Sequence, residues 1–249
     1  MPLARLRFLP ILLALVAASC FTSSDLFAQG EPCCVRPDNG NGTADHPPSC
    51  PTGYIGHLEI VDGLPPGSTI QIAATLGTPG GFTSLVQTPG GTLGGNQETW
   101  LSNMNWNMTG TGAFAAYNRS LVMPVLAGET HSAPRIPFSP VQSFPTVLHL
   151  LQGQVGFPGD PDFDLLRITA GGGFGMPSPG HTIFSSATGG WAVDSYFDIT
   201  YRIDFVGRAP GPFAGMSGST TRTYRFQLCH QEPTPAATGT WGKIKRIYR

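Results

Sequence analysis

The sequence predicts an all-β fold, an antiparallel β-sandwich of the jelly-roll or Ig-like kind, with a partly closed β-barrel as the alternative. Three observations lead to this class. Apolar residues recur with a period of two in several segments, which is typical of strands with one buried face. The 249 residues include 33 glycines and 24 prolines, which separate these segments by turns. No segment of ordinary helix length has a comparable 3.6-residue period.

The predicted strands follow one another along most of the chain. In chain order they cover residues 58–61, 69–76, 100–109, 120–125, 146–155, 165–169, 182–185, 191–205 and 223–228. The strand over 191–205 has the clearest pattern, because every odd residue except Ser195 is apolar or aromatic. Residues 100–109 alternate tryptophan and methionine with asparagine, and 223–228 alternate apolar with polar residues. The stretch 147–151 could begin a helix, but Gly153 and Gly156 favour a strand.

The first 28 residues have the features of an export signal. Two arginines precede an apolar run over residues 8–18, which is shorter than the about 20 residues of a membrane-spanning helix. Two cleavage sites are compatible with this segment. We favour cleavage after Ala28 over a lipobox-like cleavage that would leave Cys20 lipidated, since Ala17 stands where a lipobox usually has leucine. The sequence thus predicts a secreted or cell-envelope protein without a transmembrane span.

The remaining chain divides into three parts. Residues 29–231 have the size of a single β-rich domain with a disulfide-held N-terminal loop. Residues 232–241 are rich in proline, threonine, alanine and glycine and are predicted to be a linker. Residues 242–249 contain both lysines of the chain and two arginines, so we expect a basic C-terminal tail that serves sorting or anchoring.

Four cysteines remain after either cleavage: Cys33, Cys34, Cys50 and Cys229. An even number of cysteines in an exported chain predicts two disulfides. Cys33 and Cys34 are adjacent and hard to join to each other without strain, so each is expected to reach a separate partner, Cys50 or Cys229. The pairing stays open at this point.

Composition and motifs argue against several classes of function. Charged residues make up 12% of the chain and the formal net charge is −1, which gives no electrostatic reason to expect a nucleic-acid partner. The six histidines are scattered, and the stretch 215–219 lacks the second glycine of a nucleophile elbow. We therefore expect no enzyme, although a secreted hydrolase with dispersed catalytic residues is a third hypothesis.

One acidic loop is a candidate ion site. Asp160, Asp162 and Asp164 stand on alternate residues, so their carboxylates could converge on calcium if the loop curls. The competing interpretation is a solvated turn that leads into the strand at Leu165. No other cofactor is expected.

A polar row on the longest strand is a candidate binding surface. Asp194, Tyr196, Asp198 and Arg202 share one face and could bind a sugar through carboxylates and a tyrosine ring. The competing interpretation is the solvated face of an antiparallel sheet.

Several motifs together resemble a set of secreted bacterial proteins of unknown function, found mainly in environmental bacteria such as planctomycetes and often carrying a C-terminal sorting tag. The motifs span residues 38–40, 62–67, 110–112, 118–119, 140–144, 159–164, 177–180 and 193–204. The resemblance covers most of the mature chain and implies no activity and no catalytic residues.

These observations give a leading hypothesis and an alternative. The leading hypothesis is an exported, non-enzymatic protein with a structural or adhesive role at the cell envelope or in the extracellular matrix. The alternative is a glycan-binding module that depends on calcium if the loop at Asp160 is its site. The expected partner is a cell-surface glycan or an envelope component.

Overall fold

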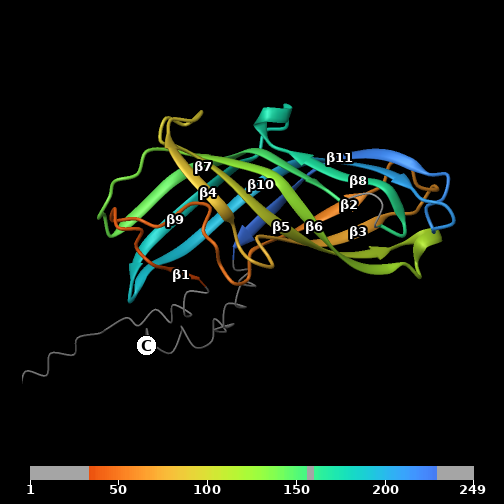
Figure 1. The fold of residues 1–249 in the computed structure, drawn as a ribbon, viewed down its shortest axis with the longest axis horizontal. Helices are drawn as coiled ribbons and strands as arrows, with labels where there is room; N and C mark the ends of the chain where they lie inside the picture. The colour runs from red at the N-terminus through yellow and green to blue at the C-terminus, as the bar shows by residue number, and fades with distance from the viewer. Residues whose placement is uncertain (1–33, 156–159, 229–249) are drawn as a thin grey trace, which may run out of the picture. The chain divides into compact units, whose positions relative to one another are not determined.

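Eleven strands, joined in one antiparallel sheet, make up most of the described part of the chain (Figure 1). The computed structural model describes residues 34–155 and 160–228, all of which belong to one compact unit. The strands are β1 (Val35–Arg36), β2 (Tyr54–Ile60), β3 (Ile70–Leu76), β4 (Thr83–Pro89), β5 (Asn96–Gly110), β6 (Asn118–Ser132), β7 (Val141–Gln154), β8 (Phe163–Ala170), β9 (Pro179–Ala187), β10 (Gly190–Gly207) and β11 (Ser217–Leu228). The described residues contain no α-helix, only the 3-10 turns η1 (Gly112–Phe114) and η2 (Gly172–Phe174). The all-β, antiparallel class predicted from the sequence is confirmed.

The sheet returns on itself. Neighbouring strands follow the order β10-β11-β2-β3-β5-β6-β7-β8, and β8 pairs again with β10. β1 and β9 extend the pairing along the first half of β10, while β4 lies on β5. One face of nearly every strand therefore contributes to a shared interior.

β10 is the central strand of this arrangement, and its sequence explains why. Its odd residues from Trp191 to Gly207 are all buried, so a two-residue period runs along the whole strand. It pairs with β11 along one side and with β9 and then β8 along the other (Figure 1). Ser195, the exception in the apolar row, is also buried.

Each predicted strand lies within or overlaps an observed one, and the observed strands are mostly longer. Residues 147–151 belong to β7, as Gly153 had indicated. β4 was not predicted, because none of its residues is fully buried and its sequence therefore has no alternation to detect. Among the described strands β4 pairs only with β5, with a register shift between Thr83 and Val86, and Leu85 is partly buried against the core.

Aromatic residues fill much of the interior in two groups. Around Tyr54, neighbouring rings include Phe82 and Phe197, with centroids 6.1 and 5.4 Å away. Around Phe213, the rings of Phe114, Phe163 and Phe205 lie within 6.3 Å. Burial of such side chains stabilises by roughly 1.5–3 kcal/mol each, which makes these groups a main source of stability.

The pairing between β2 and β11 is short. Only Gln227 and Leu228 pair in register with β2. Further along, the Tyr201 hydroxyl accepts a hydrogen bond from the Glu59 amide at 2.8 Å, and the Thr220 hydroxyl accepts from the amides of Val61 and Asp62. Side chains thus replace the backbone partners that the ladder lacks at this seam.

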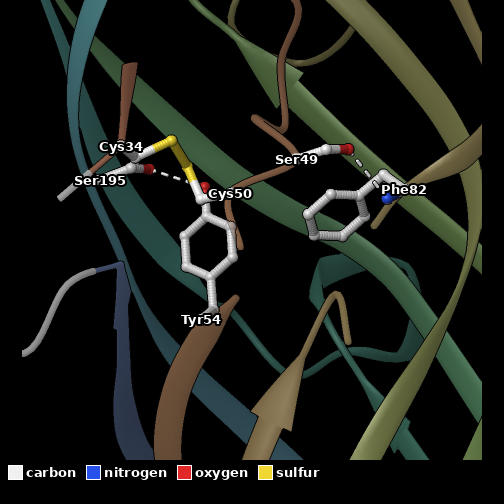
Figure 2. Close-up of a disulfide and its surroundings, with 6 residues drawn as sticks. All are labelled: Cys34, Ser49, Cys50, Tyr54, Phe82 and Ser195. Carbon is white, nitrogen blue, oxygen red and sulfur yellow. Dashed lines mark hydrogen bonds between the residues drawn. A yellow bond between two sulfur atoms is a disulfide. The ribbon is translucent and has the colours of Figure 1, made fainter. Parts of the chain in front are cut away.

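A disulfide between Cys34 and Cys50 closes the N-terminal loop (Figure 2). It confirms one of the two predicted bridges and settles the partner of Cys34. Near the disulfide, the Ser49 hydroxyl accepts a hydrogen bond from the Phe82 amide, and the Tyr54 hydroxyl donates to Ser195 (Figure 2). Cys33 and Cys229, like Cys20, the signal segment 1–28, the linker and the basic tail, lie outside the described residues.

Candidate functional site

A polar pocket of about 490 Å³ lies where the disulfide-closed loop meets β4, β5 and the connection from β6 to β7. Its polar lining consists of four amide side chains, one hydroxyl and one guanidinium: Asn39, Asn41, Gln87, Asn96, Thr43 and Arg135. Pro89, Pro134 and Pro137 add apolar wall. We call this the amide pocket. Amides both donate and accept hydrogen bonds, so this lining suits a ligand with many hydroxyl groups.

The loop that supplies Asn39, Asn41 and Thr43 is fixed at several points. The Asp38 carboxylate accepts hydrogen bonds from the amides of Gly40 and Gly42 and, at 3.0 Å, from the indole of Trp191. The indole bond, followed by the backbone bonds, holds the pKa of the Asp38 carboxyl below its ordinary value. The Gln142 amide group donates to the Gly42 carbonyl at 2.6 Å. These contacts hold the loop in place.

The connection from β6 to β7 presents an exposed aromatic ring beside this loop. Phe138 is 78% exposed, and its ring lies where a Cβ on Gly42 would clash with it. Phe138 also has a φ of +62°, a left-handed conformation that is unfavourable for a bulky residue. Its amide donates to the Gly42 carbonyl, which holds the strained backbone in place. Strained residues of this kind cluster at ligand sites.

Buried charges lie behind the pocket. The Arg135 side chain is only 5% exposed, and one of its nitrogens lies 3.7 Å from the Glu98 carboxylate. Arg135 donates to the Ala44 carbonyl at 2.9 Å and to the Thr43 hydroxyl at 3.3 Å. Burial lowers the pKa of Arg135, and the nearby Glu98 opposes that shift. Arg135 thus joins the loop to β5.

The Asn96 amide continues the wall of the pocket. In the orientation that satisfies its neighbours, its oxygen accepts from Arg135 at 3.1 Å and from Gln87 at 2.6 Å. Gln87 and Asn41 are both exposed. Asn41 makes no side-chain hydrogen bond within the described residues, so its amide is available to a ligand.

A chain of hydrogen bonds leads from these charges into the interior. The His46 imidazole contacts Thr182 at 3.2 Å, Thr182 contacts Ser195 at 2.7 Å, and Tyr54 donates to Ser195 at 2.9 Å. All four side chains are fully or almost fully buried. Because no substrate can reach these hydroxyls, the chain is a structural network. Ser195, as the one polar residue in an apolar row, was its only sign in the sequence.

On the polar row of β10, Tyr196, Asp198 and Arg202 contact charged side chains that lie outside the row. Asp198 accepts two hydrogen bonds of 2.8 Å from Arg225, whose guanidinium lies 4.0 Å from the Tyr196 ring centroid. The Arg225 bonds lower the pKa of the Asp198 carboxyl. Asp194 is exposed near one end of the row, and Arg202 contacts Asp204 at 3.3 Å. Sugar binding on this face stays a prediction.

The three carboxylates of the acidic loop are paired with arginines from other parts of the chain. Asp160 and Asp162 both bond the guanidinium of Arg119, and Asp164 pairs separately with Arg208 at 2.7 Å. Burial raises the pKa of the Asp160 carboxyl, but the bonds from Arg119 and from two backbone amides outweigh it and lower the pKa overall. Calcium binding here stays a prediction, and a calcium ion would have to displace Arg119 from between two carboxylates.

Histidine and carboxylate side chains gather at one other place. Glu129, His131 and His149 have ligand atoms within 4.8 Å of one another, the only such group of three in residues 34–155 and 160–228. Among the same residues, no helix is long and apolar enough to cross a membrane.

Searches against protein-family models, curated protein sequences and solved structures found no significant match. The fold and the site by themselves define an all-β domain with a disulfide-closed loop and a polar pocket.

Proposed function

We propose that this protein is an exported, non-enzymatic adhesive protein that binds glycan in the amide pocket. The observation that carries this proposal is an amide-rich lining together with an exposed, strained aromatic residue, Phe138, which packs beside Gly42 of the loop that lines the pocket. Amides match the vicinal hydroxyls of a sugar, and an aromatic face matches the C–H face of a sugar ring.

The pocket also suits a binding role because its lining is held in place. The disulfide, the bond between Asp38 and Trp191, and the Arg135 contacts fix the loop before any ligand arrives. Preorganisation reduces the entropy lost on binding and so strengthens affinity for a given set of contacts. Asn41 and Gln87 remain exposed at this fixed surface.

The export part of the proposal rests on the apolar, arginine-led first 28 residues and on the resemblance to secreted bacterial proteins. Mass spectrometry of the mature N-terminus tests it. A chain that begins after residue 28 or at a lipidated Cys20 supports export, and an intact N-terminus in the native host contradicts it.

Glycan arrays, followed by calorimetric titration of the best ligand, test the binding site. Asn41→Ala, Gln87→Ala and Phe138→Ala should each weaken binding by about tenfold, which corresponds to ~1.4 kcal/mol. Tyr196→Ala and Asp198→Ala are matched controls on the β10 face and should change affinity less than about twofold.

Two results would contradict the proposal. Loss of binding in the β10 variants alone would move the site to that face. Hydrolysis of any glycan or ester in the panel would contradict a non-enzymatic role. Repeating the titration with a chelator tests the calcium-dependent form, in which affinity falls when calcium is removed.

A further inference from the structure

Glu129, His131 and His149 meet on the outer side of β6 and β7. Along β6, Thr130 and Ser132 alternate with Glu129 and His131. The hydroxyls of Thr130 and Ser132 donate hydrogen bonds to the buried Glu98, so Glu129 and His131 point to the opposite face of β6. His149 comes from the neighbouring strand, and its ring stacks on His131 with centroids 4.3 Å apart.

A β-bulge places His149 in this position. Glu129 pairs with Leu150 and Thr130 pairs with Leu148, so the register passes over His149. A bulge adds one residue to one strand and redirects its side chain, and bulges are frequent next to functional sites. Here the redirected side chain is an imidazole, and it faces a second imidazole and a carboxylate.

Two glycine-rich turns cover the pair of imidazoles. A Cβ on Gly91 would lie 3.0 Å from the His131 ring, and a Cβ on Gly173 would lie 3.2 Å from Nε2 of His149. Any larger residue at either position would crowd the rings. The absence of side chains on these turns thus leaves the imidazoles room beneath them.

The hydrogen bonds of His131 orient its ring. Nε2 lies 2.7 Å from the Glu129 carboxylate, and Nδ1 lies 3.1 Å from the Thr92 amide and 2.9 Å from the Thr92 hydroxyl. In metal sites the histidine nitrogen that does not bind the metal usually carries a proton and donates it to an acceptor, whereas Nδ1 of His131 accepts a hydrogen bond from the Thr92 amide. The His149 imidazole makes no hydrogen bond within the described residues and is only partly buried, so a nitrogen lone pair is accessible.

We propose that Glu129, His131 and His149 form a site for a transition-metal ion of the zinc class. Two imidazoles and one carboxylate are a donor set that zinc and its neighbours favour, and three protein ligands leave one position for water or a ligand. His149 also lines a pocket of about 320 Å³ with Val147, Leu148, Pro177 and Pro179, so the open position adjoins an apolar cavity.

Metal binding requires one rearrangement at His131. The metal takes the lone pair of Nε2, so the proton on Nε2 is lost while Nδ1 gains a proton. Nδ1–H then donates to the Thr92 hydroxyl, and the Thr92 amide gives up its bond to Nδ1. The imidazole stays neutral throughout, and its tautomer changes.

Equilibrium dialysis of the full chain against zinc, with thiols alkylated beforehand, tests the site. We expect one zinc per wild-type chain and a loss of affinity of at least about tenfold in both His149→Ala and Glu129→Gln. His57→Ala removes an exposed histidine on β2 and should bind as the wild type does. Circular dichroism checks that each variant folds. If His149→Ala does not fold, the near-isosteric Glu129→Gln variant provides the test.

Nitrogen NMR of labelled histidine gives a second readout that a structural role would not change. Zinc should shift the His131 signals from the Nε2–H to the Nδ1–H tautomer. The proposal is overturned if zinc does not bind at one per chain, if binding survives in the folded His149→Ala variant, or if the tautomer is unchanged at saturation.

Discussion

The Nδ1 atom of His46 lies 3.7 Å from a carboxylate oxygen of Glu98, and both side chains are completely buried. This distance is too long for a hydrogen bond, and Nδ1 has no other partner among the described residues. Glu98 is instead satisfied by the hydroxyls of Thr130 and Ser132, and it lies opposite Arg135. One carboxylate thus faces two basic groups that come from different loops.

Stability should fall as the pH drops below about 6.5. Burial lowers the pKa of His46 below its ordinary value of 6.5, although Glu98 opposes the shift. Between the two pKa values the unfolded chain binds the proton and the folded chain does not, so protons favour unfolding there. The slope can reach about 1.4 kcal/mol per pH unit. Urea unfolding across this range should show the slope in the wild type and a flatter profile in His46→Gln. Identical profiles would contradict this assignment.

Removal of Glu98 should destabilise the fold strongly. Glu98→Ala leaves the Arg135 charge buried beside no carboxylate, which typically costs about 3–5 kcal/mol in the free energy of unfolding. Glu59→Ala is the matched control, because its partner Arg222 has a side chain that is 45% exposed and such pairs contribute only about 0–1 kcal/mol. Denaturant unfolding measures both. Equal losses in the two variants would show that burial of the pair is unimportant.

The disulfide should stabilise both the fold and the amide pocket. Cys34 and Cys50 are 16 residues apart, and a bridge over such a loop contributes about 3 kcal/mol by restricting the unfolded chain. The double variant with serine at both positions should lose a similar amount in thermal or urea unfolding. It should also bind the pocket ligand more weakly, since Asn39, Asn41 and Thr43 lie in the closed loop. Unchanged affinity would show that the other contacts hold the loop by themselves.

Gly128 should not tolerate even a methyl group. A Cβ there would lie 2.3 Å from the ring of Trp100, which is buried. Gly128→Ala should therefore cost about 1–3 kcal/mol through overpacking. Gly172→Ala is the control, because its Cβ would meet no atom nearer than 3.8 Å and should change stability little. A stable Gly128→Ala variant would mean that Trp100 can move.

Strands with one buried face could be predicted from the sequence, and strands without one could not. The two-residue period identified β10 because its odd side chains are buried along its full length. Thr83–Pro89 form β4 through backbone pairing to β5, and their exposed side chains carry no pattern. The position of β9 beside both β7 and β10 likewise depends on register, which composition does not encode.

The candidate sites depended even more on contacts between distant residues. Asp160 and Asp162 were predicted as a possible ion site from their spacing, but their partner Arg119 comes 41 residues earlier than Asp160. His131 and His149 meet because of a bulge between two strands, and no spacing along the chain indicates that bulge. The exception at Ser195 was visible in the sequence, and its buried hydrogen bonds explain it.

The seam between β2 and β11 also bears on how copies of this protein behave toward one another. An open strand edge offers its amides as a template for a second chain, which is a route to aggregation. At this seam the amides of Glu59, Val61 and Asp62 are already bonded to the Tyr201 and Thr220 hydroxyls. Because the Tyr201 and Thr220 hydroxyls already bond these amides, a strand of another chain cannot use them as donors, even though the backbone pairing between β2 and β11 is incomplete here.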